Sequence, residues 1–297
     1  MKIVPLEHVG AKIEDVDLSS ISEDEAVGIS KAASDYGFAL IQNQPMNPYQ
    51  QIKMADFIGD VPTKKLTPVQ EKLHPKSSLE VPGCIYISNE LDEDGNPNGT
   101  SMHGPLFWHQ DGIPYKTITQ YTLFHCIVSN TIGGRTMYVD MRKAWNSVPQ
   151  DLKEYLKDKK ALHAINKLKI YEKKHTCDLN YYADLIKEDL DNLEEYFKKD
   201  GWEYYWHPVC MKHPVNGREC LIANPRLETY LIEDTEYEDA MIILDRLLGI
   251  MLSNGIYEHT WSAGDTILWD NISAAHARKT FPDNNLRKFR RCAINLR

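Results

Sequence analysis

Long apolar runs are missing from this 297-residue sequence. A membrane-spanning helix needs roughly 20 consecutive apolar residues, and the most apolar stretch, 240–252, is interrupted by Asp245 and Arg246. The first eight residues lack the apolar core of a signal peptide. We therefore expect a protein with no membrane segment and a cytoplasmic location.

Positive charge and paired cysteines are also scarce. Lys and Arg number 34 against 43 Asp and Glu, a net charge of −9, whereas nucleic acids and anionic membranes need a basic surface. The six cysteines never occur as Cys-x-x-Cys, which argues against a zinc or disulfide framework and suits a reducing compartment. Neither nucleic acid nor membrane is an expected partner.

What is present is enough apolar material for a large core, since 42% of the residues are hydrophobic. The sequence contains no internal repeat and no low-complexity linker. We therefore expect a single domain over 1–297, with a largely helical, charged insertion at about 141–198.

Cap patterns place the first helices. Ser22 with Glu25 forms a capping-box pattern for a helix that should stop at Gly37, and Asn47-Pro48 should open a second helix that closes at Gly59. A third helix is expected at 236–253. Strands are expected at 38–41, 83–88, 120–128, 136–139, 203–210, 219–223, 256–260, 265–269 and 287–296. Without a regular βαβ alternation, this order favours an α+β fold with a mainly antiparallel sheet or barrel.

Three residues suggest a metal centre. His109 and Asp111 lie two apart, so in a strand their side chains would share one face, and His276 follows the predicted strand 265–269 in what should be a loop. Two imidazoles and one carboxylate form the facial triad that holds non-haem Fe(II) and leaves positions for a co-substrate and O₂. With 11 His and 43 acidic residues, one or two His-x-Asp/Glu triplets are expected by chance. The triplet alone is thus equally compatible with a half-buried strand.

Arg287, eleven residues after His276, is a candidate anchor for a carboxylate. The alternative is a basic surface end, because several Lys and Arg surround it. Strand alternation would put Arg287, Phe289 and Arg291 on one face and Arg290 on the other with Cys292. An interior arginine would then need an anionic partner.

The chain resembles the taurine dioxygenase (TauD/TfdA) family of Fe(II)/2-oxoglutarate dioxygenases over nearly its whole length. The motifs that carry the resemblance are Gly10-Ala11-Lys12-Ile13, Val16-Asp17-Leu18, Gly37-Phe38 to Gln44, Pro48-Tyr49-Gln50-Gln51, Trp108-His109-Gln110-Asp111, Gly133-Gly134-Arg135-Thr136, His213 to Arg218 and Gly264 to His276. The resemblance implies a distorted jelly roll (double-stranded β-helix) flanked by helices. It also implies His109, Asp111 and His276 as metal ligands, and Thr136 with Arg287 as anchors of 2-oxoglutarate.

The resemblance further places Arg291, His74, Asn89 and the turn with Arg226 near the substrate. Three of the residues that the resemblance implies have a plainer interpretation: Thr136 could simply start a strand, and Arg226 and His74 could be surface residues. The acidic, turn-rich segment 89–107 could be either a surface loop or a lid.

The predicted activity is oxidation of a C–H bond in a small anionic, amino-acid-derived metabolite, with release of succinate and CO₂. Hydroxylation, desaturation and ring closure, as in natural-product synthases, all remain open. The alternatives are a metal-dependent hydrolase with Zn²⁺ in the same ligands and a non-catalytic jelly-roll binding protein. A homo-oligomer is possible because the family usually forms dimers or tetramers.

Overall fold

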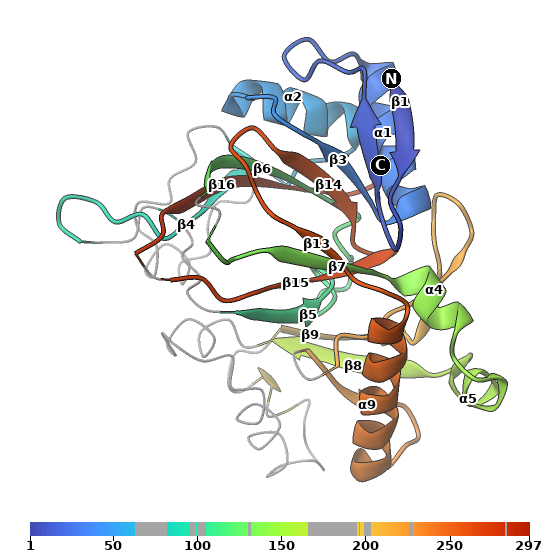
Figure 1. Ribbon diagram of the computed structural model, residues 1–297. Coiled ribbons are helices and arrows are strands. Elements are labelled where there is room, and N and C mark those ends of the chain that lie inside the picture. The colour runs from blue at the N-terminus through green and yellow to red at the C-terminus, as the bar shows by residue number, and fades with distance from the viewer. Residues whose placement is uncertain are drawn as a thin grey trace.

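The computed structural model describes residues 1–62, 82–95, 99, 105–129, 132–165, 195, 197–198, 203–225, 228–282 and 284–297. Its framework is two β-sheets that face one another, with helices on their outer sides (Figure 1). No helix in these ranges has the length and apolar character that crossing a bilayer requires.

The major sheet has seven strands in the order β1-β2-β3-β14-β6-β16-β4. All neighbouring pairs are antiparallel except β2 and β3. Its strands are β1 (Lys2–Pro5), β2 (Ala11–Glu14), β3 (Phe38–Ile41), β4 (Cys84–Ser88), β6 (Tyr121–Ser129), β14 (Thr266–Asp270) and β16 (Arg287–Ile294).

The minor sheet has four antiparallel strands in the order β13-β7-β15-β5. They are β13 (Tyr257–His259), β7 (Thr136–Asp140), β15 (Ala274–Arg278) and β5 (Leu106–His109). Two smaller sheets lie beyond it. They contain β12 (Thr229–Ile232), β8 (Lys160–Ile165) and β9 (Glu203–Pro208), and the pair β10 (Cys210–Lys212) and β11 (Glu219–Leu221).

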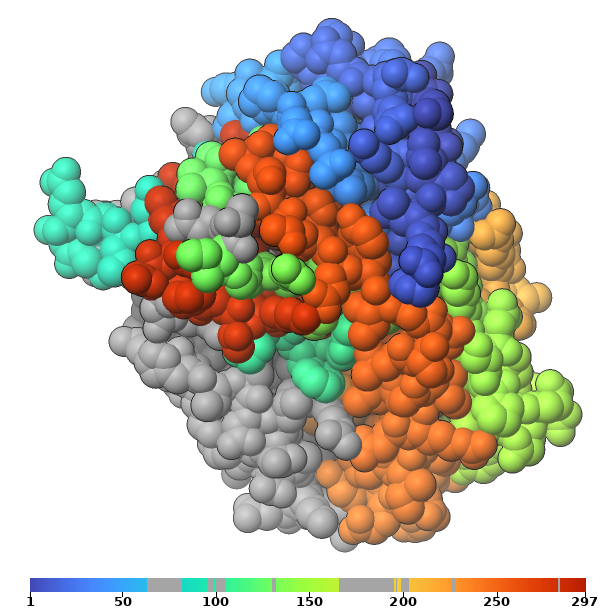
Figure 2. Space-filling model, viewed as in Figure 1, coloured from blue at the N-terminus to red at the C-terminus, as the bar shows by residue number. Residues whose placement is uncertain are grey.

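Two helices cover the outer face of the major sheet, and their ends follow the cap patterns. Helix α1 (Glu23–Tyr36) has the expected capping box at Ser22 and ends at Gly37, whose φ of 98° suits glycine. Helix α2 (Pro48–Ile58) begins at the cap Asn47, whose side chain accepts from the Gln50 amide. Figure 2 shows this N-terminal part, in blue, covering one end of the molecule.

The other helices pack on the minor sheet and its neighbours. They are α4 (Met141–Asn146), α5 (Gln150–Leu156) and α9 (Tyr237–Ser253). Their apolar faces form one core cluster with residues of β7 and β15, such as Val139 and Ala275. A separate cluster under α1 and α2 includes Ile29 and Met54. A third, aromatic cluster lies between the two sheets and includes Phe38, Tyr138 and Trp269.

Parts of the expected secondary structure need correction. Residues 160–165 form strand β8, although they fall in the segment expected to be largely helical. Most of this strand is buried, and it pairs with β9 and β12, so tertiary pairing decides its conformation. Residues 166–194 of that segment lie outside the described residues. The expected strand 203–210 is divided into β9 and β10 at Val209.

Candidate active site

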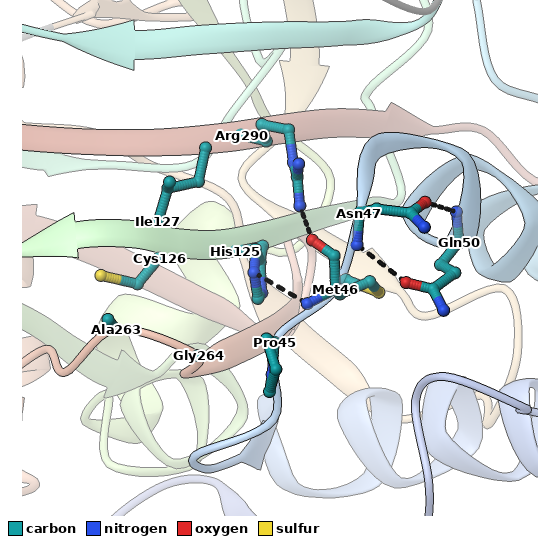
Figure 3. A pocket seen from close by; sticks show the side chains of 10 residues that line it. All are labelled: Pro45, Met46, Asn47, Gln50, His125, Cys126, Ile127, Ala263, Gly264 and Arg290. Atoms are coloured by element: carbon teal, nitrogen blue, oxygen red, sulfur yellow. Dashed lines mark hydrogen bonds between the residues drawn. The ribbon is translucent and has the colours of Figure 1, made fainter.

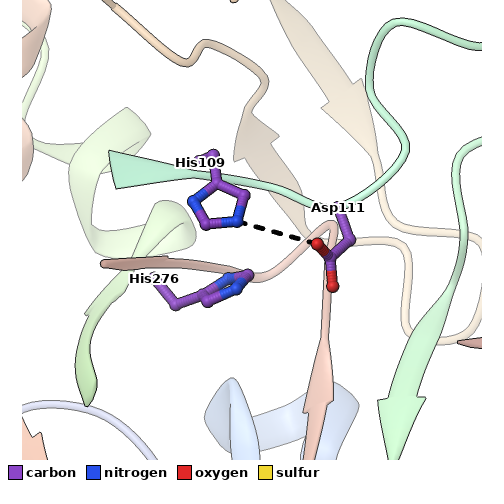
Figure 4. Close-up of side chains that lie close together, drawn as sticks. All are labelled: His109, Asp111 and His276. Atoms are coloured by element: carbon purple, nitrogen blue, oxygen red, sulfur yellow. Dashed lines mark ion pairs between the residues drawn. The ribbon is translucent and has the colours of Figure 1, made fainter. Parts of the chain in front are cut away.

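The structure brings His109, Asp111 and His276 together. One ligand atom from each, two imidazole nitrogens and a carboxylate oxygen, lie within 4.8 Å of one another (Figure 4). His109 and His276 are register partners across β5 and β15, and their ring centroids are 4.1 Å apart. The pairing of two strands that are distant in sequence therefore builds the cluster.

The local geometry differs from the sequence expectation in two ways. Strand β5 ends at His109, so Asp111 lies in the following turn and not in the same strand. The turn uses Gly112, whose φ is 81° and where a Cβ would lie 2.9 Å from the Thr119 nitrogen. His276 lies in the middle of β15, where a loop was expected. Pairing of β15 with β5 and β7 makes this segment a strand.

The protonation states suit a cation. His109 Nδ1 lies 2.8 Å from the Phe107 carbonyl, which can only accept, so Nδ1 carries the proton and Nε2 presents a lone pair. Burial lowers the pKa of His109, and burial together with the His109 imidazole lowers the pKa of His276 to about 3. Both imidazoles are therefore neutral near pH 7.

Asp111 is held ionised by its neighbours. Burial by itself would raise the pKa of Asp111, but the Arg291 guanidinium and the two histidines keep that pKa below its ordinary value. Its Oδ2 accepts a 2.8 Å bond from Thr122 Oγ1 and pairs with Arg291 Nη2 at 3.0 Å. Its Oδ1 faces His109 Nε2 at 3.7 Å. Oδ2 is thus bound by Thr122 and Arg291, whereas Oδ1 faces the two histidines.

A buried amide network fixes the backbone around this carboxylate. Asn271 Oδ1 accepts from the Asp111 amide at 3.1 Å and from Trp269 Nε1 at 2.8 Å, and Asn271 Nδ2 donates to Thr122 Oγ1. Sequence reasoning did not identify Thr122 or Asn271 as site residues. The motif Trp269-Asp270-Asn271 was noticed, but nothing in the sequence shows which residue a single amide will contact.

Gln110, between two of the candidate ligands, points away into the protein. Its Nε2 donates to the Asn271 carbonyl at 3.0 Å, and its backbone amide donates to Asn224 Oδ1 at 3.0 Å. The turn that begins at Asn224 is thereby tied to the triplet, although Arg226 in that turn lies outside the described residues.

Arg287 is buried at the start of β16 with its guanidinium between two aromatic rings. The guanidinium carbon is 4.7 Å from the centre of the Phe281 ring and 4.8 Å from that of Phe289. Its Nε is buried without a hydrogen-bond partner, and no ion pair within the described ranges uses this side chain. Burial lowers the pKa of Arg287 to about 10, so the group remains charged at pH 7. It is a buried cation that has no anionic partner among the residues that the structure describes.

Gly134 lies beside the Arg287 guanidinium, where a larger residue would crowd it. A Cβ on Gly134 would lie 3.0 Å from both Cζ and Nε of Arg287. Two residues later, Thr136 begins β7, and its Oγ1 accepts a 2.8 Å bond from Trp261 Nε1. Trp261 in turn packs edge-on against Phe289, 5.1 Å between centroids. Thr136 and Arg287 thus border one aromatic wall.

The same wall reaches the metal triplet. Trp269 lies 4.7 Å from the His276 ring and 5.5 Å from Phe124, which stacks on Phe289 at 4.7 Å. The interior between the two sheets therefore runs from the His/Asp/His cluster at one end to Arg287 at the other, along a water-excluding surface.

Of the remaining residues predicted to contact substrate, the structure describes Arg291 and Asn89 but not His74. Arg291 is on the same face as Arg287, as alternation predicted, but it pairs with Asp111. Asn89 uses its amide to accept from the Arg287 backbone and to donate to the Asn285 carbonyl, both at 2.8 Å. These bonds favour a positioning role for Asn89 over the expected substrate contact. His74 lies outside the described residues, as do parts of the proposed lid, 96–98 and 100–104.

Comparison with known proteins agrees with this architecture. The family model described as taurine catabolism dioxygenase TauD, TfdA family matches residues 2–293. Pentalenolactone F synthase of Streptomyces avermitilis is 24% identical over 97% of this chain and 91% of its own length. The (S)-phenoxypropionate/alpha-ketoglutarate-dioxygenase of Sphingobium herbicidovorans is 23% identical over 92% of this chain and 88% of its own.

Solved structures show the same fold. AAD-2, crystallised with Mn(II) and N-oxalylglycine, superposes with a TM-score of 0.74 at 19% identity, covering 100% of this chain and 97% of that one. A putative alpha-ketoglutarate-dependent taurine dioxygenase from Burkholderia xenovorans gives 0.73 at 16%, covering 100% and 93%. The sheets described above are accordingly those of a jelly roll. The chain belongs to the TauD/TfdA family and is an oxidoreductase of the 2-oxoglutarate-dependent dioxygenase class.

Proposed function

We propose that this protein binds Fe(II) through His109, Asp111 and His276 and couples 2-oxoglutarate turnover to oxidation of a C–H bond in a small carboxylate-bearing metabolite. The observation that carries the proposal is a cluster of two neutral histidines and an ionised aspartate, which shares one interior wall with a buried arginine that has no anionic partner among the described residues. Iron with 2-oxoglutarate and O₂ would supply the oxidising power, and 2-oxoglutarate would leave as succinate and CO₂.

The donor set fits Fe(II). Two imidazole nitrogens and one carboxylate oxygen are the donors that non-haem Fe(II) takes, and because the three lie within 4.8 Å of one another these residues would hold the ion. Because Thr122 and Arg291 occupy Asp111 Oδ2, the carboxylate would bind through Oδ1 alone. The opposite face of the ion would remain available.

The Arg287 region fits a dicarboxylate. A carboxylate placed between the guanidinium and the Thr136 hydroxyl would neutralise a buried charge, which otherwise carries a large desolvation cost. Asn89 would hold the Arg287 backbone in register with β4. The aromatic side chains between Arg287 and His276 would exclude water from the co-substrate.

The substrate class is inferred from chemistry and relatives. Two relatives are named for the carboxylates phenoxypropionate and 2,4-dichlorophenoxyacetate, and one for sulfate esters, so anionic substrates recur. Arg291 is 24% exposed in its side chain and lies against Asp111, which places a cation at the metal cluster where an anionic substrate would approach. Amino-acid-derived carboxylates are the first compounds to test.

The alternatives from sequence predict different behaviour. A Zn²⁺ hydrolase would have no use for the buried Arg287, and a binding protein would need no open face on the metal. Hydroxylation, desaturation and ring closure all begin with abstraction at the same C–H bond, so product analysis has to distinguish them.

The deciding experiment measures succinate release from 2-oxoglutarate with Fe(II) and a panel of amino acids, N-substituted amino acids, aryloxyalkanoates and sulfate esters. We expect at least one carboxylate to raise succinate formation well above the substrate-free rate, with equimolar oxidised product. Fe(II)-independent product formation would instead support the hydrolase. Absence of succinate with every compound, under conditions where Mn(II) and 2-oxoglutarate bind, would contradict the proposed reaction.

A further inference from the structure

A cavity lies on the face of the major sheet that α2 covers. Its volume is about 580 Å³, and it is lined by residues from β6, from the segment before β14, from β16 and from the start of α2 (Figure 3). Arg290 lines it, whereas its neighbours Arg287 and Arg291 face the interior between the sheets. The cavity is therefore separated from the metal cluster by the thickness of one sheet.

The charge of Arg290 has no counter-charge among the residues that the structure describes. Three arginines in the described ranges are buried, namely Arg142, Arg287 and Arg290. Arg142 forms a 2.7 Å ion pair with Asp140, and Arg287 has the proposed co-substrate. Arg290 forms no ion pair with any residue that the structure describes, although it is only 5% exposed. A buried charge of this kind calls for an anion.

The guanidinium is nevertheless firmly positioned. Its Nε donates to Gln51 Oε1 at 3.0 Å and its Nη2 donates to the Met46 carbonyl, both neutral acceptors. Gln51 is itself anchored, because its Nε2 donates to the carbonyls of Leu123 and Arg290 at 3.1 Å. None of the hydrogen bonds among the described residues uses Nη1. A guanidinium that is held in place by two hydrogen bonds, and whose Nη1 bonds to no described residue, is suited to bind a carboxylate.

The other polar groups around the cavity already have partners. Asn47 and Gln50 bond to each other in the capping box of α2. His125 accepts from the Met46 amide and bonds to Thr266 through Nδ1. No acidic residue is among the described residues that line the cavity. Of these residues, Arg290 is consequently the one that brings a charge to a ligand.

The rest of the lining is apolar. Pro45, Met46, Ile127 and Ala263 are among its lining residues. Ile127 is the residue that β6 leaves unpaired where the register with β16 shifts, between Val128 and Cys126. Such bulges re-aim side chains and often occur beside binding sites. The cavity volume falls within the range of small-molecule sites.

We propose that this cavity is a second ligand site, which binds a small monocarboxylate with an apolar tail. The carboxylate bonds to Arg290, and the tail lies against Pro45, Met46 and Ile127. Because Arg290 and Arg291 are consecutive in β16, a ligand here occupies the opposite face of the strand from the residue that pairs with Asp111.

The test measures binding of hexanoate to the full-length protein by calorimetry, with hexanamide and succinate as comparison ligands. We expect hexanoate to bind with a dissociation constant in the millimolar range or below, and hexanamide and succinate to bind at least about tenfold more weakly. The variant Arg290→Gln should weaken hexanoate binding by about 10–100-fold. Arg297→Gln, which alters an exposed arginine near the same end of the chain, should leave it unchanged.

Two further variants keep the result decisive. Ile127→Trp fills the cavity without touching Arg290 and should abolish hexanoate binding even if Arg290→Gln fails to fold. Arg287→Met removes the cation of the other face and should leave hexanoate binding intact. Loss of binding in Arg287→Met, or equal affinity for hexanoate in wild type and Ile127→Trp, would overturn the proposal, as would no hexanoate binding by the wild type.

Discussion

At the scale of single residues, Asp111 is the most sensitive position. Its carboxylate is the one anionic donor of the cluster, so Asp111→Ala should lower metal affinity and reduce substrate-dependent succinate formation by at least about 100-fold. Mn(II) titration and a succinate assay measure the two effects. Asp151→Ala, on the exposed face of α5, is the matched control. Full turnover by the Asp111 variant would remove this residue from the ligand set.

Arg287 should govern the 2-oxoglutarate requirement. Replacing it with Ala removes a charge-assisted carboxylate bond worth about 1.5–3 kcal/mol, so KM for 2-oxoglutarate should rise roughly 10–150-fold. The value of kcat at saturating co-substrate should change much less. Arg135→Ala provides the control, because this arginine is exposed and pairs with Glu258 only 3.2 Å away. An unaltered KM would show that a different residue holds the distal carboxylate.

Gly134 offers a sharper test of the same region. A Cβ at Gly134 would press on the Arg287 guanidinium, and its φ of 61° disfavours other residues. Gly134→Ala should therefore lower the free energy of unfolding by about 1–2 kcal/mol and also raise KM for 2-oxoglutarate. Gly217→Ala has a similar φ of 70° but nothing within 4 Å, so it should show the stability loss alone. Equal KM values for the two variants would argue against crowding at Arg287.

At the scale of elements, the helix caps are independent of the site. Ser22 and Glu25 satisfy two backbone amides of α1 reciprocally. Ser22→Ala should lower the free energy of unfolding by about 1 kcal/mol without changing KM for any substrate. Urea denaturation measures this, with Lys31→Ala on the exposed face of α1 as a control that should stay within about 0.5 kcal/mol. A shift in KM would mean that α1 is coupled to the site.

These caps also show what the sequence can predict about elements. Both ends of α1 and the start of α2 were predictable because their defining features are local. The two capping boxes join residues three apart, and the Gly37 amide that ends α1 donates to the Ala33 carbonyl four residues earlier. Strands β5, β8 and β15 were not, because each becomes a strand by pairing with segments far away in the chain. The position of Asp111 in a turn was missed for the same reason: β5 ends at His109, the residue that pairs with His276 of the distant strand β15.

At the scale of the whole molecule, the types and spacing of residues predicted more of the site than the expected helices and strands did. The spacing and type of His109, Asp111 and His276 indicated a cluster that the pairing of β5 with β15 does bring together. Thr122 and Asn271 are common residue types whose roles depend on contacts from β6 and β14. Their roles could be read only from the assembled fold. That Arg290 has no acidic partner among the described residues likewise becomes visible only in the assembled fold.

The assembled fold also buries neutral histidines, which should limit its stability in acid. Burial, together with the Arg290 charge, lowers the pKa of His125 to about 4, and burial lowers the pKa of His207 to about 4. An unfolded histidine has a pKa of about 6.5, so the unfolded state binds more protons between these values. The stabilisation is therefore complete above pH 6.5 and is lost as the pH falls toward 4.

Between pH 7.5 and pH 5.0, each of these histidines should lower the free energy of unfolding by about 2 kcal/mol, since one pKa unit corresponds to about 1.4 kcal/mol. Urea titrations at the two pH values measure the loss. His207→Gln is the informative variant, because glutamine can still donate to the Tyr115 carbonyl that His207 Nε2 contacts at 2.8 Å. Its pH-dependent loss should be about 2 kcal/mol smaller than that of the wild type. An identical loss in both proteins would show that His207 titrates alike in the folded and unfolded states.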